Sequence, residues 1–230
     1  MKPLPPKLEW ERFSRLMYWK QGEHVALIGP TGSGKTTLAL ALLPLRKYVV
    51  VLGTKPQDST LDALVSSGYI KLKTWKPLDV QLYPKRVLWP DATRLQESTR
   101  IQHKEFRKAL NSIYYEGGWC IYIDELWYLI HHLKMEKDVK TYLQQARSLN
   151  ISLVLATQRP AFVPLEVYDQ STHLFFWRDN DERNLKRISG ISWRSAKEVQ
   201  AYIANLPKHE VLYINTRTGE MLRTIAPKAN

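Results

Sequence analysis

The chain alternates short, continuous apolar runs with longer amphipathic stretches. The apolar runs that have the length of buried strands lie at residues 25–28, 48–52, 120–123, 151–156 and 173–177, with a weaker one at 86–89. The stretches with helical character lie between them, at residues 36–43, 60–66, 92–115, 126–133 and 137–148. Because parallel strands need long crossover connections, this alternation predicts an α/β fold in which helices cover both faces of a mostly parallel sheet.

The two ends of the chain depart from this alternation. Residues 8–20 predict a short amphipathic helix ahead of the core, and residues 195–205 predict a helix near the other end. Residues 210–214 and 220–223 flank a polar segment with a glycine, which predicts a C-terminal β-hairpin.

The length of 230 residues suits one well-buried domain and is short for two full domains. We therefore expect a single domain over residues 1–230. Residues 1–20 form its N-terminal extension, and residues 21–225 form its core.

The balance of charge points to an anionic partner. Lys and Arg number 34 against 22 Asp and Glu, which gives a net charge of +12 and predicts attraction to polyanions, nucleic acid first. No apolar run approaches the roughly 18 residues of a membrane-spanning helix, and the N-terminus lacks the apolar core of a signal peptide. We expect a soluble, cytoplasmic protein without a membrane span.

The strongest chemical motif lies between the first apolar run and the first core helix. It reads Gly29-Pro30-Thr31-Gly32-Ser33-Gly34-Lys35-Thr36, the phosphate-loop pattern, and is followed by Thr37. Its backbone amides and the helix N-terminus favour a bound phosphate. We expect Lys35 to contact the β- and γ-phosphates of ATP, and the Thr36 hydroxyl to hold Mg²⁺.

An acidic pair, Asp124-Glu125, directly follows the apolar run at 120–123. Sites in open α/β sheets form at the carboxyl ends of strands, so Asp124 is expected to hold Mg²⁺ and Glu125 to act as the base that activates water. The alternative is an acidic pair that only begins a helix, because carboxylates favour helix N-termini. The phosphate loop upstream favours the catalytic interpretation.

The segment that runs from Gln145 to Pro160 and contains Ala156-Thr157-Gln158-Arg159-Pro160 resembles the corresponding segment of the FtsK and HerA family of DNA translocases. With the phosphate loop and the acidic pair in the same order, the resemblance covers about residues 20–225. It implies a three-layer, RecA-like (ASCE) P-loop NTPase fold, hydrolysis of ATP with Mg²⁺ coupled to movement of double-stranded DNA, and a homo-oligomeric ring of six subunits.

The resemblance also implies roles for individual residues. Gln158 matches the polar sensor that touches the γ-phosphate or the attacking water. Asp181-Glu182-Arg183 looks like the family's Asp-x-Arg segment, so Arg183 is the preferred arginine finger for the pocket of a neighbouring subunit. Arg147 and Arg187 are competing candidates.

One segment departs from the family pattern. Family members often have an acidic residue before Pro-Lys after the second strand, where this chain has Gly53-Thr54-Lys55-Pro56. Lys55 is therefore expected to contact DNA. Further basic candidates for DNA contact are Lys71, Lys73 and Lys76, residues 100–108, and residues 183–194.

A motor core of this size resembles the genome-packaging ATPases of membrane-containing and archaeal icosahedral viruses. That resemblance implies a motor that pumps DNA into a preformed capsid, with capsid or portal-vertex proteins as partners, in the host cytoplasm or at the packaging vertex. Two alternatives stay open: a conjugation or segregation motor, and a nucleotide-gated phage assembly protein that does not translocate DNA.

Overall fold

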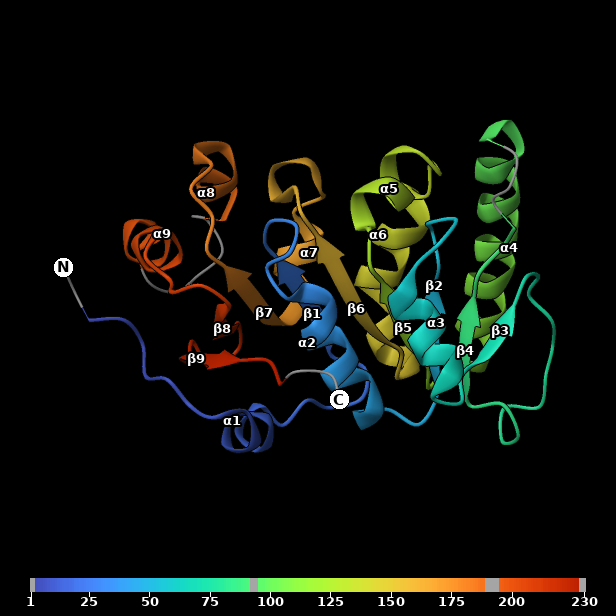
Figure 1. Ribbon diagram of the computed structural model, residues 1–230, viewed down its shortest axis with the longest axis horizontal. Helices are drawn as coiled ribbons and strands as arrows, with labels where there is room; N and C mark the ends of the chain where they lie inside the picture. The colour runs from blue at the N-terminus through green and yellow to red at the C-terminus, as the bar shows by residue number, and fades with distance from the viewer. Residues whose placement is uncertain (1–2, 92–94, 189–194, 228–230) are drawn as a thin grey trace.

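The computed structural model describes residues 3–91, 95–188 and 195–227, and Figure 1 shows a central sheet between layers of helices. Within the described residues the sheet has nine strands in the order β3-β4-β2-β5-β6-β1-β7-β8-β9. The strands are β1 His24–Ile28, β2 Val49–Leu52, β3 Ile70–Leu72, β4 Lys85–Leu88, β5 Cys120–Ile123, β6 Ser152–Thr157, β7 Ser171–Trp177, β8 Glu210–Asn215 and β9 Met221–Ile225.

Strand pairing is parallel from β3 to β7 and antiparallel at the C-terminal end. The pairs β7–β8 and β8–β9 are antiparallel, so the predicted hairpin forms the last two strands of the sheet. Strand β6 pairs with β1 on one side and with β5 on the other. Because β1, β6 and β5 are parallel, the residues that follow them meet at one edge of the sheet.

The helices form the outer two layers. They are α1 Trp10–Met17, α2 Lys35–Leu42, α3 Ser59–Ser66, α4 Leu95–Glu116, α5 Leu126–His131, α6 Glu136–Gln145, α7 Glu166–Asp169, α8 Glu182–Ile188 and α9 Ala196–Ala204. Buried residues of α1, α2 and α3 pack on one face of the sheet, and those of α4 to α9 pack on the other. Short 3₁₀ turns follow α2, α6 and β6. The mostly parallel three-layer fold that the sequence predicts is confirmed.

Strand β1 shows why the sequence signal for the central strands is strong. Side chains of a strand alternate between its faces. Val25 and Leu27 pack with the α1–α3 layer, whereas Ala26 and Ile28 pack with the opposite layer. All four side chains are buried. A strand covered on both faces is therefore read in the sequence as an unbroken apolar run.

The N-terminal segment packs on the sheet and along its last strand. Phe13 of α1 lies edge-on to Phe175 and Tyr213, with ring centroids 5.9 and 5.1 Å away. Before the helix, the Leu8 amide donates to the Arg223 carbonyl at 2.8 Å, and the Arg223 amide donates to the Pro6 carbonyl at 2.7 Å. Figure 1 shows this segment running past β9 to α1. It shields an edge strand that would otherwise be open to pairing.

Several elements differ from the sequence prediction. Helix α1 is shorter than the predicted 8–20, because Tyr18 has a left-handed backbone with φ of 36°. Strand β3 was not predicted, since it has only three residues and a polar Lys71 at its centre. Helix α8 was not predicted either. The start of the predicted helix 92–115 lies outside the described residues, which resume at the first residue of α4.

The helices differ in length and polarity. None of the helices that the structure describes has both the length and the hydrophobicity needed to cross a bilayer.

His24, at the start of β1, should make folding stability depend on pH. It is 2% exposed, its Nδ1 accepts the Leu153 amide at 3.1 Å, and burial lowers its pKa to about 4. In the unfolded chain its pKa is about 6.5, so the unfolded state binds the proton more tightly. Stability from this group is complete above pH 6.5 and is lost as the pH falls towards 4, by up to roughly 3 kcal/mol.

Urea unfolding of the wild type and of His24→Asn, at pH 7.5 and pH 4.5, measures this contribution. The Asn side chain keeps an acceptor near the Leu153 amide but does not titrate in this range. We expect the free energy of unfolding to fall less between the two pH values in His24→Asn than in the wild type or in the control His132→Asn, whose side chain is exposed. Equal losses in all three proteins would contradict the assignment.

Candidate active site

The phosphate loop, residues 29–34, connects the end of β1 to the start of α2. Two of its glycines are required by geometry. A Cβ on Gly29 would lie 2.7 Å from the Trp177 Cβ, and Gly34 has a φ of 112°, which side chains rarely allow. The loop therefore lies tightly against the end of β7. The loop leads directly into the first turn of α2, and an anion site at a helix N-terminus needs this arrangement.

Lys35 lies in the concave side of this loop. Its side chain is largely buried, and its Nζ donates to the Gly29 and Pro30 carbonyls at 2.7 and 2.8 Å. Burial lowers the pKa of Lys35 to about 8, against the opposing effect of Asp124 and Glu125. The ammonium is thus held where phosphate oxygens would replace the two carbonyls as its acceptors.

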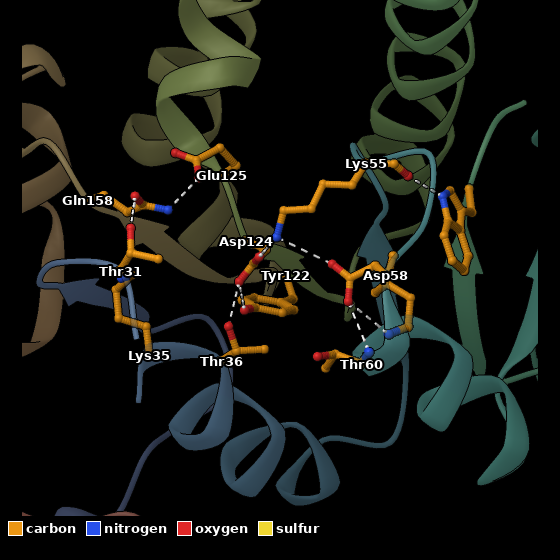
Figure 2. Close-up of polar contacts among 12 residues, drawn as sticks. Thr31, Lys35, Thr36, Lys55, Asp58, Thr60, Tyr122, Asp124, Glu125 and Gln158 are labelled. Atoms are coloured by element: carbon orange, nitrogen blue, oxygen red, sulfur yellow. Dashed lines mark hydrogen bonds and ion pairs between the residues drawn. The ribbon is translucent and has the colours of Figure 1, made fainter. Parts of the chain in front are cut away.

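Asp124 lies at the centre of the polar contacts shown in Figure 2. Its Oδ1 accepts a hydrogen bond from Thr36 Oγ1 at 3.1 Å and another from the Tyr122 hydroxyl. A threonine hydroxyl and a carboxylate are hard oxygen ligands of the kind that Mg²⁺ prefers, so these two side chains fit a magnesium ion. The sequence analysis did not predict a role for Tyr122. Residues two apart on a strand share a face, so its spacing from Asp124 could have indicated the contact.

Lys55 has partners that the sequence analysis did not predict. Its Nζ lies 3.3 Å from Asp124 Oδ2 and 3.4 Å from Asp58 Oδ2, inside the candidate site (Figure 2). Burial opposes its charge, but the two carboxylates raise the pKa of Lys55. The Lys55 carbonyl accepts from Trp89 Nε1 at 2.6 Å, which fixes the loop after β2. The structure therefore places Lys55 beside the acidic groups of the candidate site, and its contact with DNA stays a prediction.

Gln158 joins the phosphate loop to the candidate base. Its Oε1 accepts from Thr31 Oγ1 at 2.6 Å, and its Nε2 donates to Glu125 Oε2 at 3.0 Å. Burial, and then the neighbouring Asp124, raise the pKa of Glu125, while Lys35, Lys55 and Arg159 oppose that rise. Figure 2 shows Gln158 between Thr31 and Glu125, with a dashed line to each. The amide thus connects three elements, the phosphate loop and the ends of β5 and β6.

These groups line a pocket of about 260 Å³ at the carboxyl edge of the sheet. Its lining residues are Thr31, Gly32, Gly34, Lys35, Thr36, Thr37, Lys55, Asp124 and Gln158. Glu125 reaches the pocket through Gln158. The structure therefore brings together the loop and the acidic pair that the sequence singled out.

The three candidate arginines lie in different environments. Arg183 is exposed on α8, where its backbone amide donates to Asp181 Oδ1 at 2.8 Å. Arg187 is half-buried and donates from Nη2 to the Val163 carbonyl at 2.7 Å. Arg147 is exposed just before β6, at the opposite edge of the sheet from the phosphate loop. None of the three lines the pocket formed by the described residues.

Several of the basic residues proposed to contact DNA have partners within the chain. Lys71 Nζ lies 3.8 Å from the centre of the Trp89 ring, and Lys73 pairs with Asp91 at 3.1 Å. On α4, Arg107 lies 3.6 Å from Asp138, and Lys108 lies 2.9 Å from Glu105. The last part of the basic segment 183–194, residues 189–194, lies outside the described residues.

No protein-family model and no curated protein matches the sequence. Solved structures match the fold. The DNA-packaging ATPase B204 from Sulfolobus turreted icosahedral virus is 17% identical over 92% of this chain and 100% of that chain, with a TM-score of 0.65. The genome packaging NTPase B204 from Sulfolobus turreted icosahedral virus 2, in complex with ATP-gammaS, is 17% identical over 87% of this chain and 95% of its own, with a TM-score of 0.59.

VirB4 of Thermoanaerobacter pseudethanolicus has a similar fold at lower identity. It is 10% identical over 90% of this chain and 89% of its own, with a TM-score of 0.66. These likenesses show a shared P-loop NTPase fold. They agree with the resemblance to FtsK and HerA that rests on residues 145–160.

Replacing Lys35 should weaken binding of the triphosphate. A hydrogen bond to a charged group contributes about 1.5–3 kcal/mol, so Lys35→Ala is expected to raise the Kd for ATP by roughly 10- to 100-fold. Isothermal titration calorimetry measures this change, with Lys137→Ala, an exposed lysine on α6, as the control. Equal affinities in Lys35→Ala and the control would exclude the proposed contact.

Proposed function

We propose that this chain is an ATPase that moves double-stranded DNA, and that it pumps a viral genome into a preformed capsid. The observation that carries the proposal is the Gln158 side chain, which bonds to Thr31 of the phosphate loop and to Glu125 at 2.6 and 3.0 Å. A motor needs a group that responds to the γ-phosphate and reaches moving parts of the protein. Its contacts with the phosphate loop and with Glu125 support that role for Gln158.

The pocket residues divide the work of hydrolysis. The loop amides and Lys35 would bind and orient the phosphates, and Thr36 with Asp124 would hold Mg²⁺, which supplies charge neutralisation when it is bound. Glu125 would accept a proton from the attacking water. Its raised pKa, caused first by burial, brings this carboxylate closer to the range in which a general base is effective.

Gln158 would couple this chemistry to movement. Its amide shares hydrogen bonds between Thr31 and Glu125, so a phosphate that recruits Thr31 or the amide would free the Glu125 carboxylate for water. Loss of the γ-phosphate would restore the present contacts. The end of β6, which carries Gln158, would therefore adopt two arrangements during each cycle.

Two further observations favour DNA as the substrate. The net charge of +12 suits phosphate contacts that are independent of sequence. The chain also shares its fold, over nearly its whole length, with B204, which is described as a DNA-packaging ATPase. We propose the host cytoplasm and the packaging vertex as its location, with capsid or portal-vertex proteins as partners.

A ring of subunits, six by the family resemblance, would complete the pocket. In the described part of the pocket, positive charge comes from Lys35 and Lys55. An additional arginine from a neighbouring subunit would stabilise charge on the transferring phosphoryl group. Arg183 is the preferred candidate, because its side chain is exposed, whereas Arg187 is tied to Val163.

The alternative is a motor for DNA conjugation or segregation, and the fold similarity to VirB4 is compatible with it. The genes next to this one would separate a viral from a conjugative role. A nucleotide-gated assembly protein is the alternative from another class, and a single measurement of DNA dependence tests it.

ATP turnover should rise when double-stranded DNA is added. We expect stimulation of several-fold at low salt that fades as salt weakens phosphate contacts. The measurement is phosphate release with and without DNA across a salt series. Turnover that is indifferent to DNA at every salt concentration would contradict the motor and favour the assembly protein.

Glu125→Gln is the matched catalytic control in this assay. The amide keeps the size of the side chain and its position beside Gln158 but cannot accept the proton of water. We expect it to bind ATP normally and to lose at least about 100-fold in turnover, with or without DNA. Turnover at the wild-type rate would refute the assignment of Glu125 as the base.

Mixing experiments test the arginine finger. Arg183→Ala alone should bind ATP but hydrolyse it slowly, because each pocket lacks a neighbour's charge. Mixing it with Glu125→Gln subunits, whose Arg183 is intact, should restore part of the turnover in the intact pockets. A mixture no more active than its two components would reject Arg183 in favour of Arg147 or Arg187.

A further inference from the structure

Lys55 extends from the loop after β2 to the carboxylates of Asp124 and Asp58 (Figure 2). Its side chain lines the same pocket as Lys35, and its Nζ lies 3.3 Å from Asp124 Oδ2. We propose that Lys55 is a movable cation of this site: its ammonium neutralises Asp124, and moves to the phosphates of ATP when that carboxylate takes a divalent cation. The proposal rests on the proposed function, because it assigns a further residue to the same nucleotide.

The Asp124 carboxylate is the group for which the two cations compete. Its Oδ1 accepts from Thr36 Oγ1 at 3.1 Å, the hydroxyl that fits a magnesium ion with it, and its Oδ2 faces Lys55. An ammonium so close offsets the negative charge that attracts a divalent cation to the same carboxylate, and the two cations repel each other at short range. The contact between Lys55 and Asp124 therefore opposes binding of the metal.

The backbone of Lys55 is fixed, whereas its ammonium is held loosely. The Lys55 carbonyl accepts from Trp89 Nε1 at 2.6 Å, and the neighbouring Thr54 carbonyl accepts from Gln102 Nε2 at 2.8 Å. The side chain is 52% exposed, and its contacts with the two carboxylates, at 3.3 and 3.4 Å, exceed the roughly 2.7–2.9 Å of a strong charge-assisted hydrogen bond. The charge can therefore move on its flexible stem while the loop stays in place.

Asp58 provides a second partner that keeps the ammonium close to the pocket. Its Oδ1 accepts from the Thr60 and Leu61 amides at the start of α3, at 3.0 and 3.4 Å, and its Oδ2 faces Lys55. This helix cap holds the Asp58 carboxylate in place independently of Lys55. An ammonium has three N–H donors, so Lys55 can leave Asp124, stay paired with Asp58 and still donate to another acceptor.

Phosphate oxygens are the acceptors that this position suits. The pocket of about 260 Å³ is lined by the phosphate loop on one side and by Lys55 on the other. Lys35 and Lys55 are both positive, so an anion that enters the pocket is attracted by both and screens their mutual repulsion. A lysine acts on phosphate as a compact point charge and needs no fixed planar geometry. Lys55 is thus placed to be a second phosphate-binding lysine beside Lys35.

Two binding measurements that require no turnover test this exchange on the wild type and on Lys55→Met, which keeps the length of the side chain but not its charge. Binding of Mn²⁺ alone, followed by electron paramagnetic resonance of the free ion, should tighten by about tenfold or more, because the competing ammonium is gone. Binding of ATP in EDTA, followed by isothermal titration calorimetry, should weaken about tenfold, because one hydrogen bond to a charged group is lost.

Two further variants control the experiment. Lys73→Met removes an exposed lysine that pairs with Asp91 at 3.1 Å, and should change neither affinity. Addition of Asp124→Asn to Lys55→Met should abolish the gain in Mn²⁺ binding, which would assign the gain to this carboxylate. A variant that fails to fold cannot produce tighter metal binding, so the expected gain is distinct from a general loss of structure.

The proposal is overturned if Mn²⁺ binding does not tighten in Lys55→Met, or if ATP binding in EDTA does not weaken. Weaker binding of both ligands would indicate that Lys55 only supports the structure of the site. Unchanged binding of both ligands with reduced stimulation by DNA would assign Lys55 to the phosphate backbone of DNA. A wild type that does not bind ATP in the presence of Mg²⁺ would instead refute the proposed function itself.

Discussion

The site depends on the register that β6 keeps with its two parallel neighbours. Ile28, the last residue of β1, pairs with Thr157, and Ile123, the last residue of β5, pairs with Leu155. The phosphate loop, Asp124 and Gln158 directly follow the last residues of β1, β5 and β6. Backbone hydrogen bonds therefore place three segments from distant parts of the chain within contact of one another. A shift of one residue in either pairing would turn the strand's side chains to the opposite face.

Within that frame, the Asp124 carboxylate organises the polar groups. One oxygen accepts from Thr36 and Tyr122, and the other faces Lys55. These contacts hold the carboxylate in one orientation, which is what a metal ligand requires. Burial acts differently on Glu125 next to it, and raises its pKa. Two adjacent carboxylates thus receive different roles, because one is paired with a cation and the other with a neutral amide.

The loop glycines show how packing and binding share a constraint. Gly29 lies against Trp177 so closely that a Cβ would not fit, and Trp177 also lines a pocket on the other side of the phosphate loop. The end of β7 therefore supports the phosphate loop from below and shapes the space beside it.

Much of the fold was predictable because the central strands are buried on both faces. β1, β2, β5 and β6 are read as unbroken apolar runs, and the phosphate loop and Asp124-Glu125 follow two of them directly. Strand β3 was not predicted, because three residues are too few to show the alternation of apolar and polar side chains that identifies an edge strand. Helix α8 was not predicted either. The family resemblance gave Arg183 a role as arginine finger but did not indicate that this residue lies on a helix.

The sequence by itself predicted which residues would contact phosphate and metal, because a phosphate loop needs glycine, lysine and threonine at neighbouring positions. It could not place Lys55, which lies 69 residues before Asp124, or show that Gln158 links Thr31 to Glu125. Those contacts arise only from the order and register of the strands in the sheet. The hydrophobic pattern of a sequence identifies a strand but does not show which strand pairs with it.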